Sequence, residues 1–139
     1  MQRQDYIIKQ IDQLAKVLSK LLADVLGLKN DLKITEAEKL VNTVFEKDLG
    51  FNFDEFLEVE DVKFITFLTS NNFDLASMEE FANLFFEIGT SSTEKEKQIN
   101  CFSKAKIIYN HLNTERKTFS FDFMTKLNAM EKQIQSNEN

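Results

Sequence analysis

Apolar residues recur at helical spacing along most of the chain, most clearly in residues 4–27. Seven of them follow one another at alternating steps of four and three residues: Ile7, Ile11, Leu14, Leu18, Leu21, Val25 and Leu28. This heptad spacing predicts one long amphipathic helix. Ile8, Ala15 and Leu22 widen the stripe, which favours packing inside a bundle. The alternative is that a second subunit or a partner helix covers part of this possible interaction stripe.

The rest of the chain predicts five further helices joined by short loops. Their approximate ranges are 36–48, 60–70, 74–88, 93–112 and 120–135. A less regular stretch, 52–61, predicts a short helical turn. Each range carries apolar residues at steps of three and four, and no strand-like alternation persists. We therefore expect about six helices in one domain, 1–135, followed by a disordered tail, 136–139.

Three glycines are candidates for the ends of helices. Gly27 and Gly50 follow apolar helical runs, and we expect each to end its helix, Gly27 in a left-handed conformation. Gly89 begins a run of four small or polar residues, so we expect a break in the chain there.

Capping residues mark the helix starts. Thr35 with Glu38 has the spacing of a capping box, in which each side chain satisfies a backbone donor. Asp74, Thr93 and Ser120 are also placed to begin helices.

Composition supports an all-α fold, either a helical bundle or a short α-solenoid. The 139 residues include three glycines and no proline, which leaves little material for hairpin turns. Fourteen phenylalanines supply a large apolar surface, and we expect most of them in the core. A single cysteine, no apolar leader and no membrane-length apolar run predict a cytoplasmic protein without a membrane span.

The net charge of −6 is distributed unevenly. Residues 34–92 carry thirteen acidic and three basic side chains, whereas residues 93–117 carry three acidic and six basic ones. The acidic middle makes nucleic acid an unlikely partner there. We interpret both regions as solvated helix faces. The alternative for the basic region is docking to an acidic surface, or weak binding of anions or nucleic acid.

We find no candidate catalytic, cofactor-binding or metal-binding residues. Cys101 and His111 lie too far apart along one predicted helix to share an ion or to form a nucleophile–base pair. The stretch after Asp48 lacks the alternating oxygen ligands and sixth-position glycine of a calcium loop. The alternative interpretation is a small enzyme with a pocket lined by carboxylates of residues 34–92. Such a pocket would need buried acids with raised pKa values.

One segment resembles a known repeat. The stretch 81–89, with Cys101 to Ala105, Ile108 and Tyr109, resembles a degenerate tetratricopeptide unit, which is a pair of packed helices. The resemblance implies that six residues pack the pair together: Phe81, Ala82, Phe85, Phe102, Ala105 and Tyr109. The chain departs from the repeat in its long 89–93 linker, in Gln98, where a small residue is usual, and in lacking a second copy.

The N-terminal residues carry a second resemblance. Residues 4–7, 10–11, 14–16 and Leu18, followed by the Gly27-Leu28 helix end, resemble the start of an uncharacterised bacterial family that pairs an N-terminal helix with a tetratricopeptide-like remainder. The resemblance implies a fold and no activity. Together these observations favour a non-enzymatic module that binds an unknown protein or peptide, with a homodimer as one form.

Overall fold

A computed structural model describes residues 2–50 and 52–138 of the chain, with side chains described for 13–50 and 52–136. Within these residues the chain is helical and contains no strand, so the all-α prediction is confirmed. The helices are α1 (Gln2–Asn30), α2 (Ile34–Val44), α3 (Phe53–Glu58), α4 (Phe64–Ser70), α5 (Leu75–Ser91), α6 (Lys95–Arg116) and α7 (Phe121–Glu138). Two short turns join them, the π-helical η1 (Phe45–Leu49) and the 3₁₀-helical η2 (Asp61–Lys63). Helix α7 includes residues 136–138 of the expected disordered tail, and residue 139 lies outside the described residues.

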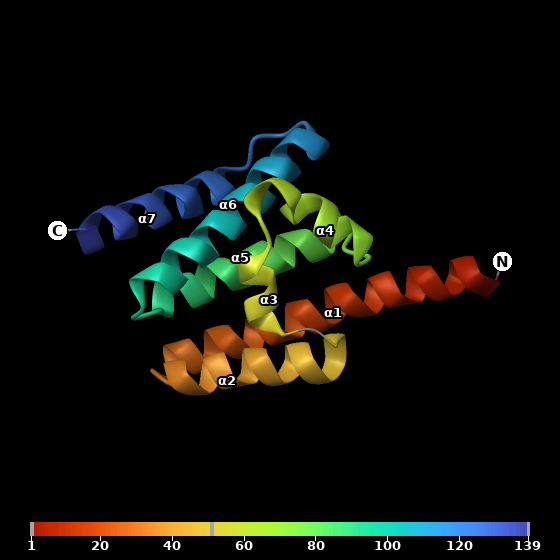
Figure 1. Cartoon of the computed structure of the whole chain (residues 1–139), viewed down its shortest axis with the longest axis horizontal. Coiled ribbons are helices and arrows are strands. Elements are labelled where there is room, and N and C mark those ends of the chain that lie inside the picture. Colours follow the sequence, from red (N-terminus) through yellow and green to blue (C-terminus); the bar gives the residue numbers. More distant parts are fainter. Residues whose placement is uncertain (1, 51, 139) are drawn as a thin grey trace.

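The helices form a bundle around α5. Helix α5 packs against α6 on one side and α1 on the other, while α7 covers α6 and α2 lies along α1 (Figure 1). The shorter α3 and α4 cross in front of this stack (Figure 1). The two ends of the chain lie at opposite ends of the molecule (Figure 1).

Phenylalanine rings fill the centre of the bundle, as the composition predicts. Of the thirteen phenylalanines that the structure describes, nine are buried. Phe81 on α5 is the hub, because its ring lies 4.3 Å from that of Phe85, 4.9 Å from Phe56 and 5.3 Å from Phe73, centroid to centroid. Edge-on and tilted contacts of this kind add stability beyond the burial of apolar area. The ring cluster therefore joins α3, α4 and η1 to α5.

Helix α1 does not end at Gly27, contrary to our prediction. It continues to Asn30, and the residue in the left-handed conformation is Leu32, with φ of +61°. The backbone N–H groups of Leu32 and Lys33 donate to the carbonyls of Lys29 and Leu28, which closes the helix with a Schellman-type motif. Gly27 stays helical because the next turn is half-buried against the core, at Leu28 and Lys29.

Two of the four predicted helix starts are correct. Asp74 Oδ1 accepts a hydrogen bond from the Ser77 N–H at 2.8 Å, and Ser120 Oγ accepts one from the Phe123 N–H at 3.2 Å. Helix α2 instead begins at Ile34, directly after the Leu32 turn, so Thr35 lies inside it and forms no capping box. Helix α6 begins after Glu94, so Thr93 lies outside it.

Gly50 ends its helical segment as predicted, whereas Gly89 does not. Gly50 has φ of +74° and follows the wide π-helical turn η1. Helix α5 runs through Gly89 to Ser91, where the Thr90 and Ser91 hydroxyls donate to the carbonyl of Glu87. The expected break is therefore the short connection 92–94, and Gly89 serves close packing instead of a turn.

Candidate functional site

The heptad stripe of α1 is divided between the core and the outer part of the helix. Leu18, Leu21 and Val25 are buried against the rest of the bundle, and Leu14 is half-buried. The side chains of Ile7 and Ile11 lie outside the part of the chain whose side chains are described. The internal interpretation therefore holds for the second half of the stripe.

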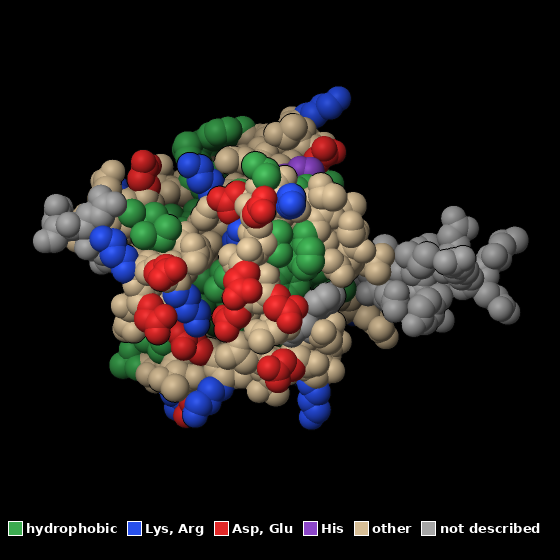
Figure 2. All heavy atoms as spheres, in the orientation of Figure 1, with side chains coloured by type: hydrophobic (Ala, Val, Ile, Leu, Met, Phe, Trp, Pro, Cys, Tyr) green, Lys and Arg blue, Asp and Glu red, His purple; other side chains and the backbone are tan. Residues whose placement is uncertain are grey.

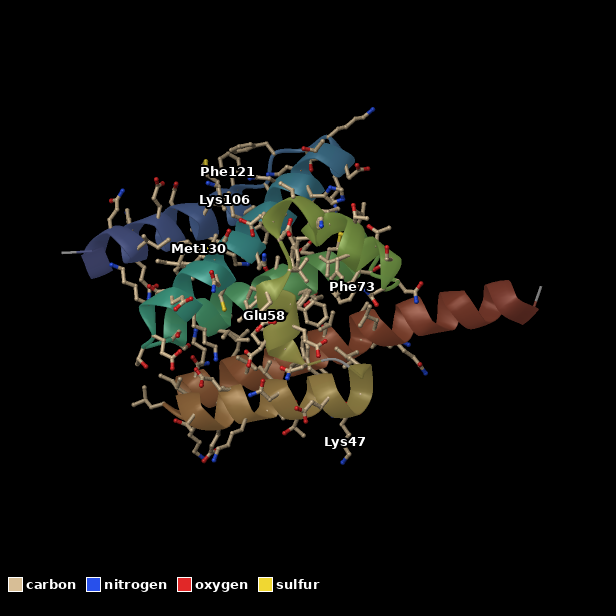
Figure 3. The ribbon with its side chains drawn as sticks, viewed as in Figure 1. Lys47, Glu58, Phe73, Lys106, Phe121 and Met130 are labelled. Carbon is tan, nitrogen blue, oxygen red and sulfur yellow. The ribbon has the colours of Figure 1, made fainter. Side chains whose placement is uncertain are left out.

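A groove of about 810 Å³ opens where the stripe leaves the core. Three elements form it: α1, the end of α2 with η1, and the end of α4. Its lining residues are Gln13, Leu14, Lys16, Val17, Lys20, Leu21, Asp24, Leu40, Val44, Asp48, Leu49, Ser70, Asn71, Asn72 and Phe73. In Figure 3 the labelled Phe73 lies between the end of α4 and α1.

The groove has an apolar floor and a polar rim. Its apolar lining is half-buried at Leu14, Val17, Leu40, Val44 and Leu49, and buried at Leu21 and Phe73. Two lysines and two aspartates stand exposed along it: Lys16, Lys20, Asp24 and Asp48. On α1 the lining runs from residue 13 to 24, which is about 16 Å along a helix axis.

The wall at the end of α4 is fixed by local hydrogen bonds. Asn71 Nδ2 donates to the carbonyl of Phe67 at 2.8 Å, and Asn72 adopts a left-handed conformation with φ of +67°. Asparagine tolerates this conformation better than most residues. The Phe73 N–H then donates to the carbonyl of Leu68, which directs the chain back into the core.

The six residues expected to pack the helix pair are all in the core. Phe81, Ala82, Phe85, Phe102, Ala105 and Tyr109 are each at most 2% exposed. They therefore offer no surface to a partner. The ring contacts of Phe81 and Phe85 join α5 to η1, α3 and α4, and the ring of Tyr109 packs against Phe123 on α7. The residue that the sequence analysis missed here is Gly89, whose missing side chain admits the ring of Phe102. Gln98 is also buried, and its Nε2 donates to the carbonyl of Gly89 at 2.9 Å.

The acidic middle segment forms a surface, and none of its thirteen acids is buried. Asp54, Glu55 and Glu58 on α3 are exposed, as are Glu60 and Asp61 beside η2. Figure 2 shows Asp and Glu side chains gathered over this part of the molecule. A second hollow of about 300 Å³ lies here, lined by Asp54, Leu57, Glu58, Glu94, Glu96, Lys97 and Asn100.

The pKa of one carboxyl in the middle segment is raised. Glu80 is half-buried on α5, and its desolvation, together with the charge of Glu79, raises its pKa. Lys126 opposes the shift. Because no acid of residues 34–92 is buried, Glu80 has no buried carboxylate as a partner in this segment.

Lys104 departs from the solvated basic face that we predicted for residues 95–117. It is 3% exposed, and its ammonium donates to the carbonyl of Val59 and, at 2.8 Å, to Asp61 Oδ1. The ammonium also lies 5.0 Å from the ring centroid of Phe64, in a cation–π contact. The hydrogen bond from Lys104 lowers the pKa of Asp61, and its charge and Ser103 add to the effect. This pair therefore ties η2 to α6.

Cys101 and His111 both lie on α6, ten residues apart. Cys101 is buried, and desolvation raises the pKa of its thiol to about 12, so little reactive thiolate forms at neutral pH. His111 is half-buried near the end of α6. Among the described residues no three His, Cys, Asp or Glu side chains lie where they could hold a metal ion together.

An exposed aromatic pair lies at the start of α7, Phe119 in the preceding connection and Phe121 as the first residue of the helix, and the sequence pattern did not indicate it. Phe119 and Phe121 are 66% and 75% exposed, and their rings meet edge to face at 5.8 Å. Figure 3 shows Phe121 at the outer side of the bundle. Nothing in the described part of the chain covers this pair.

No described helix combines the length and the apolar character needed to cross a bilayer. Comparisons with protein-family models, with curated proteins and with solved structures found no match for this chain. The two resemblances stated above therefore stay predictions.

Proposed function

We propose that this protein is a non-enzymatic interaction module that binds an amphipathic helix in the groove between α1, α2–η1 and the end of α4. The observation that carries the proposal is the groove itself, with an apolar floor and a charged rim on a rigid helical frame. Helices bind such grooves by inserting apolar anchors while their polar faces remain in water.

The shape of the groove favours a helix over a compact ligand. Its apolar floor follows two helical rows, one on α1 through Leu14, Val17 and Leu21 and one through Leu40, Val44 and Leu49, within a lining that runs on α1 from residue 13 to 24. A row about 16 Å long matches three turns of a bound helix, enough for anchors at positions i, i+4 and i+7. The rim carries equal numbers of lysines and aspartates, so the groove selects by apolar pattern more than by net charge.

A displayed library of random sixteen-residue peptides, selected on the purified chain, tests the proposal. We expect enriched peptides with apolar residues at helical spacing, because the floor offers contacts at that spacing. Their affinity is then measured by fluorescence polarisation against groove variants. Val44→Glu places a charge on the floor, and we expect it to weaken binding by more than about tenfold.

Two tryptophan substitutions provide a matched pair that leaves the core untouched. Lys20 is exposed and lines the groove, so Lys20→Trp should obstruct it. Lys47 is exposed, does not line the groove and points away from the bundle (Figure 3), so Lys47→Trp should leave binding unchanged. A selection that enriches no helical peptide, or peptides that bind both variants equally well, would overturn the proposal.

A further inference from the structure

The outer rim of the groove on α1 is basic. Lys16 and Lys20 line the groove, are exposed, and lie four residues apart on α1. At about 3.6 residues per turn, both lysines fall on one side of Val17, whereas Leu21 falls on the other side, toward the core. The two lysines therefore form an edge along the outside of the groove, next to its apolar floor.

The positive charges of this edge have no acidic partner in the described part of the chain. No ion pair between described residues includes Lys16 or Lys20. Of the two aspartates that line the groove, Asp48 lies across it on η1, and Asp24 lies one turn beyond Lys20 on α1. The charges lining the groove sum to zero, but its two lysines are gathered on one edge.

We propose that the helix bound in the groove is acidic along one edge, with two Asp or Glu residues one turn apart that pair with Lys16 and Lys20. The proposal rests on the proposed function and adds the chemical class of the partner. Residues four apart stand on the same face of a helix, so an acidic pair at that spacing matches the spacing of the two lysines. Packed helix axes are about 8–10 Å apart, which long lysine side chains can bridge.

The acidic edge sets which way the bound helix is turned. Opposite charges at the rim of an interface determine partner choice and orientation more than affinity. A helix with basic residues on the same edge would meet two like charges, although its apolar anchors were unchanged. Because exposed ion pairs contribute little individually, we expect the acidic helix to bind about three- to tenfold more tightly than its basic counterpart.

Parallel peptide selections on wild type and on Lys16→Glu/Lys20→Glu test the proposal. We expect wild type to enrich peptides with Asp or Glu at positions i and i+4 beside the apolar anchors, and the variant to enrich Lys or Arg there. One enriched acidic peptide is then compared with a version whose two acids are replaced by lysine, by fluorescence polarisation. The acidic peptide should bind wild type more tightly, the basic one should bind the variant more tightly, and high salt should reduce both preferences.

Lys33→Glu/Lys47→Glu is the matched control. Both lysines are exposed and neither lines the groove, so this variant changes the net charge equally without changing the rim. We expect it to prefer the acidic peptide as wild type does. A control that prefers the basic peptide as strongly as Lys16→Glu/Lys20→Glu does would overturn the proposal, because net charge alone would then explain the reversal. Circular dichroism and thermal midpoints check that each variant is folded.

The two proposals can fail separately. If helical peptides are enriched without an acidic pair, or if Lys16→Glu/Lys20→Glu does not reverse the charge preference, the acidic partner is wrong and the interaction module stands. If no helical peptide is enriched on wild type, the interaction module is wrong and the acidic partner with it.

Discussion

Phe102 on α6 lies so close to Gly89 on α5 that a β-carbon at position 89 would stand 2.5 Å from Cε1 of its ring. The same β-carbon would lie 2.7 Å from Cδ1 and 3.2 Å from the β-carbon of Cys101. Distances under about 3 Å do not occur between real side chains without movement of one of them. Helices α5 and α6 therefore approach one another closely at this point because residue 89 has no side chain.

Gly89→Ala should destabilise the protein. Overpacking a buried site costs about 1–3 kcal/mol, and the ring of Phe102 is only 2% exposed and has little room to move. Alanine returns about 1 kcal/mol of helix propensity, so we expect a net loss of about 1 kcal/mol in the free energy of unfolding. Urea unfolding followed by circular dichroism measures it.

Gly27→Ala is the matched control for that substitution. Gly27 is also helical, but it is exposed, and a β-carbon there meets no atom within 4 Å. We expect a gain of about 0.5–1 kcal/mol. Equal effects at the two positions would show that the contact with Phe102 carries no cost.

Leu32→Gly should stabilise the protein. Leu32 holds φ of +61° while its side chain is 86% exposed, so the residue is strained and contributes little packing. Relief of that strain outweighs the added freedom of glycine in the unfolded chain, and we expect a gain of about 0.5–1 kcal/mol. Leu32→Ala retains the β-carbon and should give no gain. The thermal midpoints of wild type, Leu32→Gly and Leu32→Ala test this prediction. A midpoint for Leu32→Ala as high as that for Leu32→Gly would contradict it.

Asp61→Asn should weaken the protein and alter its response to acid. The pKa of Asp61 is below its ordinary value of 3.8, so the unfolded chain binds its proton more readily than the folded one. The stabilisation by Asp61 is therefore complete well above pH 3.8 and is lost as the pH falls below that value. Because the Asp61 side chain is 60% exposed, we expect a loss of about 1 kcal/mol at neutral pH.

The pH dependence of the stability difference provides a control for the Asp61→Asn prediction. The difference between wild type and Asp61→Asn should shrink at about pH 3 and below, where Asp61 of wild type takes up its proton. Glu60→Gln removes a neighbouring charge whose contact with Lys63 is 3.8 Å long and exposed, and should change stability little. A difference between wild type and Asp61→Asn that does not depend on pH would exclude the charge pair as its cause.

Cys101 should resist alkylation in the folded protein. Burial raises the pKa of its thiol from 9.0 to about 12, which lowers the thiolate fraction at mildly alkaline pH by about a thousandfold. Iodoacetamide labelling followed by mass spectrometry should be slow in native buffer and fast in urea. Rapid labelling without denaturant would show that α6 opens locally, since the residue itself is fully buried.

The sequence was sufficient for the helical class and for most of the core. Apolar spacing located six of the seven α-helices, and the Phe-rich segments formed the ring cluster around Phe81. The signals that failed were the capping residues Thr35 and Thr93 and two of the three glycines. Gly27 and Gly89 look like helix ends from their neighbours, but whether glycine ends a helix or admits a ring depends on what packs against it, which is tertiary information.

The candidate site was predicted only in part. The α1 stripe indicated a surface that a partner helix can use, but its spacing cannot show which turns the bundle covers, and Leu18, Leu21 and Val25 are internal. The other two walls come from Leu40, Val44 and the Asn71–Asn72 turn, which are distant in sequence from α1. Buried Lys104 was missed for a similar reason, since its partners Val59 and Asp61 lie on another segment.

The order of the helices in the stack also bears on how the chain folds. Helices α5 and α6 are neighbours in sequence and pack together after closing a short loop, whereas α2, α3 and α4 separate α1 from α5, so the α1–α5 contact closes a much longer loop. The α5–α6 hairpin can thus form early, and α1 with α2 docks on it late. The free energy of that last docking step sets how often α1 separates from the hairpin, and Lys29, which joins α1 to Glu87 and Thr90 on α5, acts on this step directly.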